Sequence, residues 1–235
     1  VSGKGGVGKT SLSAAFVRLL AERKPDARIL AIDADPAIGL STALGVDVKE
    51  TLDDIRKRIV NSVENNRPKE AVEMLSEARF RIIDSLVEER SFSFLAIGRL
   101  EGAGCYCKVN AYLKEVISLL AGDFDYVVID GEAGIEQISR RVMEKVSHLI
   151  LVTDPSRKGV QVLETIKRVA DEMVMYERCG VVVNRVSDPD TAQYIHINDV
   201  PVLAWIKDDR AHAGNDIKGL SIFEQIGRAS CRERV

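Results

Sequence analysis

A glycine-rich segment at residues 3–10 has the residue types and spacing needed to hold a phosphate group. It reads GKGGVGKT and fits the pattern G-x-x-x-x-G-K-T. In such a loop the backbone N–H groups close around the β-phosphate, Lys9 reaches the β- and γ-phosphates, and Thr10 ligates Mg²⁺. A chance glycine-rich turn is disfavoured, because a helical pattern follows directly. We predict an ATP site formed by Gly3, Lys4, Gly5, Gly6, Val7, Gly8, Lys9, Thr10 and Ser11.

Two further segments place carboxylates at the ends of predicted strands. In YVVIDGEAGIEQ, residues 126–137, Asp130 ends a buried strand that faces the loop, where it can hold a water on Mg²⁺. In AIDADPAIGLS, residues 31–41, Asp33 has two interpretations that stay open. It holds a water on Mg²⁺, or it caps the following turn. We therefore name Thr10, Asp33 and Asp130 as the candidate Mg²⁺ residues.

Cys105 and Cys107 form a C-x-C pair, which supplies only half of a tetrahedral metal site. No histidine has a ligand spacing to the pair, and Cys179 at the start of an apolar strand is expected to be a buried small side chain. In a two-fold dimer the same patch meets itself, so two copies would bring four sulfurs around one ion. Such a set suits Ni²⁺, Zn²⁺ or an iron–sulfur cluster. Two unconnected loop thiols are the alternative.

Short apolar runs alternate with helical patterns along the chain. The runs are short, rich in β-branched residues and apolar on both alternations, which is typical of a parallel sheet covered on both faces. This alternation predicts an α/β fold with a doubly wound, mostly parallel sheet. The expected strands are 28–35, 92–98, 125–131, 148–154, 179–185 and 200–206, and the expected helices are 10–23, 108–121, 136–146 and 158–175.

Residues 51–90 differ, because they carry charges at helical spacing. We expect two or more amphipathic helices inserted between strands, with a break at Pro68. The expected domain is 1–225, with its first strand truncated so that a handful of residues precede Val1. Residues 226–235 resemble the translation of a sequencing adapter and are expected to be a non-native tail.

The composition limits the classes of partner. The chain has 235 residues, is 46% apolar and carries a net charge of −3. It shows no apolar run of membrane-spanning length, no secretory signal and no basic surface, so we expect neither a membrane nor a nucleic-acid partner. Four cysteines in a chain of this length do not make a disulfide framework, which favours a cytoplasmic location.

Lys4, a second lysine at the start of the loop, makes the segment resemble the deviant Walker A motif. That motif belongs to a class of dimeric P-loop ATPases that includes the cell-division (MinD) and plasmid-partition (ParA) ATPases, arsenite-pump ATPases and the nitrogenase iron protein. The resemblance implies a homodimer in which Lys4 crosses to the partner's nucleotide. It also implies that Asp35 positions the attacking water and that Asn184 reads the adenine base. Lys4, Lys9 and Asp35 are the implied catalytic residues.

A closer resemblance covers GRLEGAGCYCKVN, residues 98–110, and DGEAGIEQISRR, residues 130–141. Both look like the CooC-type nickel-insertion accessory ATPases of carbon monoxide dehydrogenase. That family is implied to bind metal between subunits and to hydrolyse ATP while delivering nickel to its client metalloenzyme. Gln137 departs from the family, in which a histidine is expected after Glu136, and this puts the role of that position in doubt.

These features predict an ATP-hydrolysing metallochaperone, with two alternatives. An ATP-dependent iron–sulfur electron donor is disfavoured. Its family places one cysteine near switch II, the loop that follows the Walker B aspartate, and the corresponding residues 130–137 contain no cysteine. A positioning ATPase of the MinD or ParA type would need an amphipathic C-terminal helix or a basic surface, and residues 211–225 show neither. The two Asp-Pro pairs at Asp154 and Asp188 are expected to be turns without a chemical role.

Overall fold

The computed structural model describes residues 1–65, 68–98, 107–131, 145–188, 190, 194–197, 199–209, 214 and 218–225. The strands within these residues are β1 (Ser2–Gly3), β2 (Ile29–Asp33), β3 (Val87–Glu88), β4 (Ser93–Ala96), β5 (Tyr126–Asp130), β6 (Lys145–Thr153), β7 (Met175–Val186) and β8 (Val202–Lys207). They pair in the orders β3-β4-β2-β5 and β1-β6-β7-β8, and all pairs are parallel except β3 with β4.

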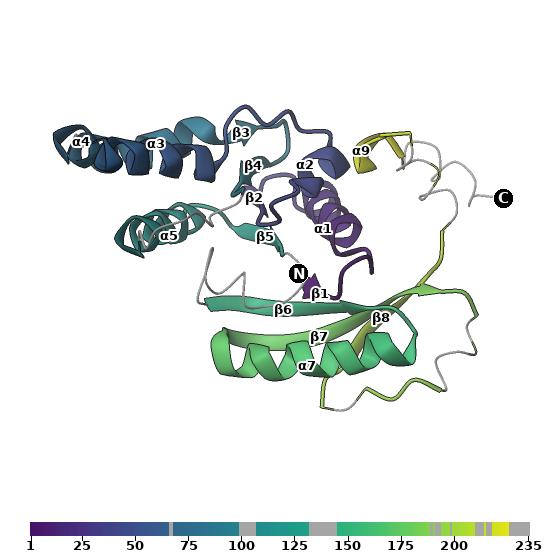
Figure 1. The fold of residues 1–235 in the computed structure, drawn as a ribbon. Helices are drawn as coiled ribbons and strands as arrows, with labels where there is room; N and C mark the ends of the chain where they lie inside the picture. The colour runs from purple at the N-terminus through teal and green to yellow at the C-terminus, as the bar shows by residue number, and fades with distance from the viewer. Residues whose placement is uncertain are drawn as a thin grey trace.

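Val1 connects the two groups of strands. Its amino group donates to the carbonyl oxygen of Ile129 at 2.7 Å, and the N–H of Gly131 donates to the carbonyl oxygen of Val1 at 3.0 Å. This is the bonding pattern of a parallel pair in which Val1 lies opposite Asp130. The short β1 therefore lies between β5 and β6, at the edge where both strands end (Figure 1).

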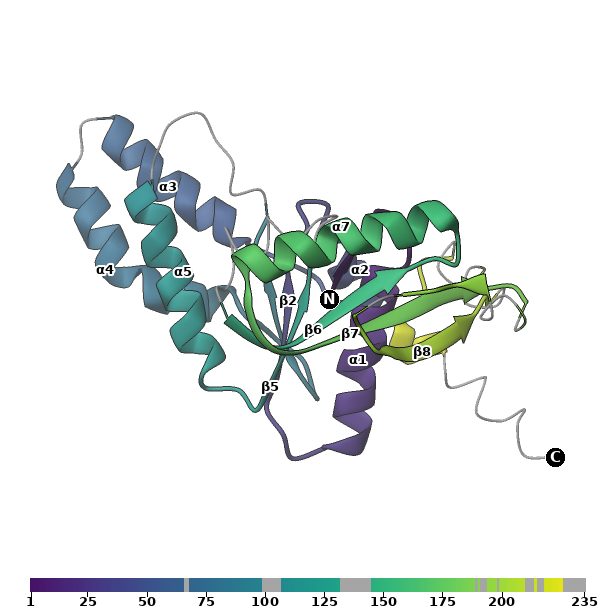
Figure 2. The ribbon, with the colours of Figure 1, turned by 90° about the horizontal axis from the view of Figure 1, so that it is seen from below.

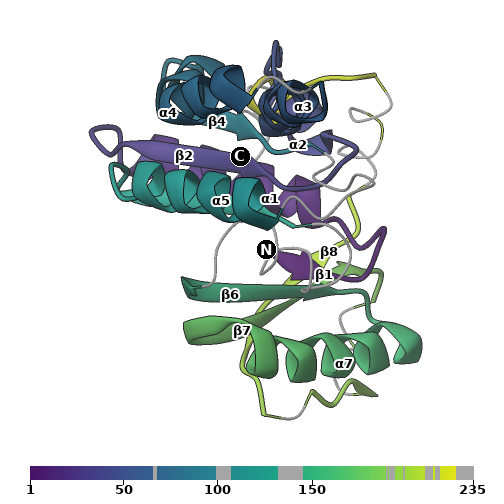
Figure 3. The ribbon, with the colours of Figure 1, turned by 60° about the vertical axis from the view of Figure 1, so that its left-hand side comes forward.

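Helices cover both faces of the β3-β4-β2-β5 group. On one face α1 (Lys9–Arg23), α2 (Gly39–Leu44) and α9 (Ile222–Gln225) pack against Ile29, Ala31, Phe94 and Val128. On the other face α3 (Leu52–Glu64), α4 (Pro68–Ser85) and α5 (Cys107–Ala121) pack against the alternate residues, which include Leu30, Ile32 and Ile129. Figure 2 shows α3, α4 and α5 gathered away from α1, and in Figure 3 β2 lies between α4 and β6. Every residue of β2 is buried, which explains its continuous apolar pattern.

The β6-β7 pair is covered by α7 (Arg157–Met173), through Leu163, Ile166 and Ala170. Val146 packs against both this cluster and the cluster beneath α5, so α5 and α7 lie on the same face of the sheet. Within the part of the chain that the structure describes, none of the helices has the length and apolar content that crossing a membrane requires.

The α/β fold with a mostly parallel sheet is confirmed, and α3 and α4 are the helices expected within residues 51–90. Pro68 begins α4, at the first helical position, where its missing N–H costs no hydrogen bond. The expected helix 136–146 is wrong at its end, because Lys145 and Val146 begin β6. The rest of that helix lies outside the described residues. The elements α2, β3 and α9 were not predicted.

Candidate functional site

The glycine-rich loop connects β1 to α1, and two of its glycines are needed for close approaches. A Cβ on Gly3 would lie 2.2 Å from the carbonyl oxygen of Val152 on the neighbouring strand. Gly8 has a φ of +91°, in the left-handed region, and a Cβ there would lie 2.5 Å from the side-chain nitrogen of Asn184. Larger residues at either position would displace the loop, so these glycines fix its path over the sheet.

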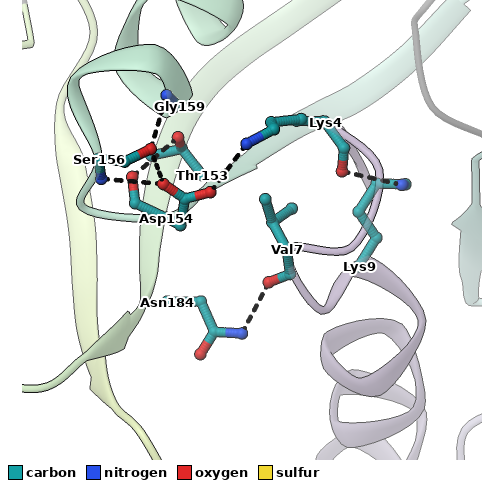
Figure 4. A network of polar contacts seen from close by, with 8 residues as sticks. All are labelled: Lys4, Val7, Lys9, Thr153, Asp154, Ser156, Gly159 and Asn184. Carbon is teal, nitrogen blue, oxygen red and sulfur yellow. Dashed lines mark hydrogen bonds and ion pairs between the residues drawn. The ribbon is translucent and has the colours of Figure 1, made fainter.

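Lys9 begins α1 and is only 8% exposed. Its Nζ lies 3.3 Å from the carbonyl oxygen of Lys4, so the side chain folds back over the loop (Figure 4). No side chain within the described residues caps the start of this helix. The N-terminal end of α1 and the Lys9 ammonium therefore direct positive charge to the same place, which suits a phosphate.

Asp130 holds the first turn of α1 through two hydroxyl groups. Thr10 Oγ1 donates to Asp130 Oδ2 at 2.7 Å, and Ser13 Oγ donates to Asp130 Oδ1 at 2.9 Å. Asp33 lies next to Asp130 in register on the neighbouring strand, and both carboxylates are buried. A hydroxyl and two carboxylates are hard oxygen donors, so the side chains here fit Mg²⁺ by their chemistry. Ser13 was not predicted, since the loop pattern stops before it.

Both oxygens of Asp33 accept backbone hydrogen bonds, from Asp35 N–H at 3.1 Å and from Leu40 N–H at 2.8 Å. The capping interpretation of Asp33 is therefore observed, and its contact with an Mg²⁺ water remains a prediction. Burial raises the pKa of Asp33 to about 7, although the two backbone bonds oppose the shift. Burial also raises the pKa of Asp130, opposed by Thr10, Ser13 and nearby positive charge.

We expect Asp33→Asn to flatten the pH dependence of stability in metal-free protein. The folded-state pKa of Asp33, about 7, lies above its ordinary value of 3.8, so folded Asp33 keeps a proton that the unfolded chain has already lost. The free energy of unfolding of the parent protein should therefore fall as pH rises from 3.8 to about 7. Because asparagine does not titrate, up to roughly 4 kcal/mol of this fall should disappear in the Asp33→Asn variant. Denaturant unfolding from about pH 4 to 8 measures it, with exposed Asp26→Asn as control. An unchanged slope would contradict burial as the cause.

Asp35 lies in the turn after β2. Its Oδ1 accepts the N–H of Ala37 at 2.9 Å, and the next turn is closed by Ile38 N–H donating to its carbonyl oxygen. Ile38 has a φ of +52°, a strained conformation for a β-branched residue. Such strain is found at segments that change conformation with a ligand. The role of Asp35 in positioning water stays a prediction.

Lys4 points away from the first turn of α1 and binds Asp154 at the end of β6. Its Nζ lies 3.3 Å from Asp154 Oδ2 (Figure 4). Asp154 Oδ1 accepts the N–H and the hydroxyl of Ser156, and Ser156 Oγ in turn accepts the N–H of Gly159 to cap α7. Partial burial opposes the shift, but these hydrogen bonds hold the pKa of Asp154 below its usual value. Asp154 lies in the turn after β6, as expected for this Asp-Pro pair, whereas its ion pair with Lys4 was not predicted.

Asn184, near the end of β7, donates its side-chain N–H to the carbonyl oxygen of Val7 at 2.8 Å. The amide therefore supports the loop from the side opposite α1 (Figure 4). Its reading of adenine stays a prediction.

Cys105, the side chain of Cys107, and the segment containing Gln137 lie outside the described residues, although Cys107 begins α5. Cys179, on β7, is half-buried, and burial raises the pKa of its thiol.

Comparison with known proteins gives four informative likenesses. A family profile described as the CobQ/CobB/MinD/ParA nucleotide binding domain matches residues 1–222. An uncharacterized ATP-binding protein of Methanocaldococcus jannaschii is 36% identical over 95% of this chain and 89% of its own length. The carbon monoxide dehydrogenase accessory protein CooC of Rhodospirillum rubrum is 28% identical over 100% of this chain and 91% of its own. The Pyrococcus horikoshii septum site-determining protein MinD complexed with Mg-ADP superposes with a TM-score of 0.65, at 25% identity over 97% of this chain and 87% of that one.

Proposed function

We propose, from the premise that this chain belongs to the CobQ/CobB/MinD/ParA nucleotide-binding family, that it is a dimeric, ATP-hydrolysing metallochaperone of the cytoplasm. Its cargo is nickel, or zinc at the same thiolates, and its client is carbon monoxide dehydrogenase or a related metalloenzyme. The observation that carries the proposal is a C-x-C pair, Cys105 and Cys107, in a P-loop ATPase similar along its whole length to a carbon monoxide dehydrogenase accessory protein.

The geometry of the loop supports the nucleotide part of the proposal. Lys9 and the N-terminus of α1 would neutralise the β- and γ-phosphates, and Thr10, Asp130 and Asp33 would hold Mg²⁺ and its waters. Asp35 orients the attacking water, so that hydrolysis yields ADP and phosphate. Catalysis of this kind depends mainly on positioning and charge.

The proposed dimer links nucleotide to metal. Lys4 of each protomer must leave Asp154 to reach the partner's nucleotide, and the same association brings Cys105 and Cys107 of the two protomers together. A ligand that favours the dimer then raises the affinity for the other ligand. Hydrolysis weakens the dimer and releases the ion to the client.

Metal titration under anaerobic conditions tests the proposal. We expect one nickel or zinc ion per dimer in the parent protein, and loss of that ion in Cys105→Ser and in Cys107→Ser. Cys179→Ser is the matched control, because Cys179 is half-buried on β7 and should leave the stoichiometry unchanged. If the Cys105→Ser and Cys107→Ser variants bind as much metal as the parent protein, the metallochaperone proposal fails.

We expect Asp154→Asn to strengthen the nucleotide-dependent dimer. Asparagine keeps an oxygen for Ser156 but removes the charge that binds Lys4. A partly exposed ion pair contributes up to about 1 kcal/mol, and two such pairs break in each dimer, so the dimer dissociation constant should fall by up to about 30-fold. Sedimentation with a non-hydrolysable ATP analogue measures it. Asp188→Asn, in the other Asp-Pro pair, is the control, and equal dissociation constants for the two variants would contradict the prediction.

A positioning ATPase remains the second candidate, because of the structural likeness to MinD. Co-sedimentation with anionic vesicles or with DNA, with and without ATP, distinguishes it. ATP-dependent binding to vesicles or to DNA would favour this alternative if the amount bound does not change when metal is removed. The iron–sulfur electron donor would instead be identified by iron–sulfur absorbance in reconstituted protein.

A further inference from the structure

Helix α2 begins against two of the candidate Mg²⁺ residues. The N–H of Leu40, the second residue of the helix, donates to Asp33 Oδ2 at 2.8 Å. Gly39, the first residue, packs on Thr10, because a Cβ on Gly39 would lie 3.6 Å from Thr10 Cγ2. A displacement of α2 would therefore disturb two of the three side chains proposed to hold Mg²⁺ and its waters.

The position of α2 depends on its packing. The helix has six residues, too few to be stable by itself, and among the described residues no side chain caps its first turn. Its N-cap residue, Ile38, has a strained left-handed conformation with a φ of +52°. Strain of this kind persists only where surrounding contacts impose it. The contacts at the other end of α2 therefore help to place its first turn.

The contacts at that other end come from α9 and the residue before it. Ile222 is 7% exposed and packs in one apolar cluster with Leu40 and Leu44 of α2. Gly45, which follows α2, lies so close to Ser221 that a Cβ on Gly45 would be 2.9 Å from the Cβ of Ser221. Figure 1 shows α9 beside α2 accordingly. The segment 221–222 thus supports the carboxyl end of α2.

Two side chains hold α9 in this place. Phe92 stacks on Phe223, with 5.6 Å between the ring centroids and 5° between the ring planes. Arg18 of α1 is 9% exposed and donates to the carbonyl oxygen of Ile222. The guanidinium carbon of Arg18 also lies 5.8 Å from the centre of the Phe223 ring, and Glu22 binds its Nε at 2.7 Å. A stacked ring pair and a buried cation therefore hold a helix of only four residues.

We propose that Phe223 is a positioning residue for the Mg²⁺-nucleotide complex. Stacked on Phe92, it holds α9 against the end of α2, and the start of α2 holds Asp33 and Thr10. Phe223 acts through α2 alone. It serves the nucleotide part of the proposed function, on which this assignment rests, and it is independent of metal delivery.

This role predicts a selective effect on binding. The phosphates would be bound by Lys9 and the loop backbone, whereas α2 contacts residues proposed to hold Mg²⁺. Loosening α9 should therefore reduce the gain in nucleotide affinity that Mg²⁺ provides. The affinity measured without Mg²⁺ should stay the same.

The experiment compares the dissociation constant of ADP with Mg²⁺ and with a chelator, in the full chain. We expect Phe223→Ala to reduce the Mg²⁺-dependent gain by on the order of 10-fold, a typical coupling between distant sites, and to change the Mg²⁺-free constant by less than about twofold. Phe223→Tyr keeps the ring and should show the gain of the parent protein. Phe80→Ala, at an exposed phenylalanine of α4 on the other face of the sheet, is the matched control.

Hydrogen exchange without nucleotide gives a second readout. The N–H of Leu40 should exchange on the order of 10-fold faster in Phe223→Ala, because its bond to Asp33 opens more often when α2 is less supported. The amides of β2, which is buried along its whole length, should exchange at the parent rate. A general loss of stability would instead speed exchange at both places.

Two results would overturn the proposal alone. One is an equal loss of affinity with and without Mg²⁺, or exchange that rises alike at Leu40 and in β2, since either would give Phe223 a merely structural role. The other is an unchanged Mg²⁺-dependent gain in the variant. If Phe223→Ala does not fold, Phe223→Leu, which stays apolar but removes the stacked ring, is measured with the same expectation. A parent protein whose ADP affinity does not respond to Mg²⁺ would overturn the proposed Mg²⁺ site, and this role of Phe223 with it.

Discussion

Lys9→Ala is expected to lower the steady-state rate of ATP hydrolysis by at least about 100-fold, because it removes the cation that faces the transferred phosphate. In the structure Lys9 is buried at the first residue of α1, and its Nζ lies 3.3 Å from the carbonyl oxygen of Lys4. Charge developing on the β- and γ-phosphates would therefore meet a pre-positioned ammonium group. Alanine keeps the helix and removes that charge.

Phosphate release at saturating Mg-ATP measures this effect, and circular dichroism checks that the variant folds. The matched control is Lys24→Ala, at the other end of the same helix, where the lysine is exposed. Its rate should equal that of the parent protein. A Lys9 variant that is folded and hydrolyses ATP at the parent rate would show that the glycine-rich loop is not the hydrolytic site.

The parts of this site that sequence predicts are those whose chemistry is local. Residues 3–10 form the loop because its backbone conformation is encoded by the glycines themselves, such as Gly8 with its positive φ. Asp130 could be placed because it ends an apolar strand that is buried on both faces. The central strands were predicted for the same reason, since their buried apolar residues alternate between two faces that are both covered by helices.

The parts that sequence missed depend on contacts between distant elements. The role of Asp154 requires β6 to lie beside β1, a neighbour relation that no periodicity specifies. The strain at Ile38 has no sequence signal, because nothing in its residue type favours a left-handed conformation. Lys145 was assigned to a helix because the amino-terminal end of β6 is exposed and carries polar residues, which hides its strand pattern. The short α2 and β3 are stabilised by packing and pairing rather than by their own propensity.

Lys4→Ala is expected to abolish the coupling between ATP and metal, to weaken the nucleotide-dependent dimer, and to lower the rate of ATP hydrolysis on the order of 10³-fold, the loss in kcat expected when a cation supplied to a phosphate in trans is removed. The proposal requires Lys4 and the Cys105 and Cys107 pair to act in the same dimer. Metal affinity with and without a non-hydrolysable ATP analogue, measured beside sedimentation, tests this. In the parent protein the analogue should tighten metal binding, and in the variant it should have no effect. Lys49→Ala, at an exposed lysine, is the control.

Comparison with Asp154→Asn separates two explanations of a Lys4 effect. If Lys4 served only to bind Asp154 within one protomer, both variants would break the same 3.3 Å ion pair and would behave alike. If Lys4 acts on the partner's nucleotide, the two variants differ in sign, because Asp154→Asn releases the lysine and Lys4→Ala removes it. Opposite shifts in dimer affinity therefore support the dimer. An intact link between ATP and metal in the Lys4 variant would show that the cysteine pair does not depend on the dimer that Lys4 completes.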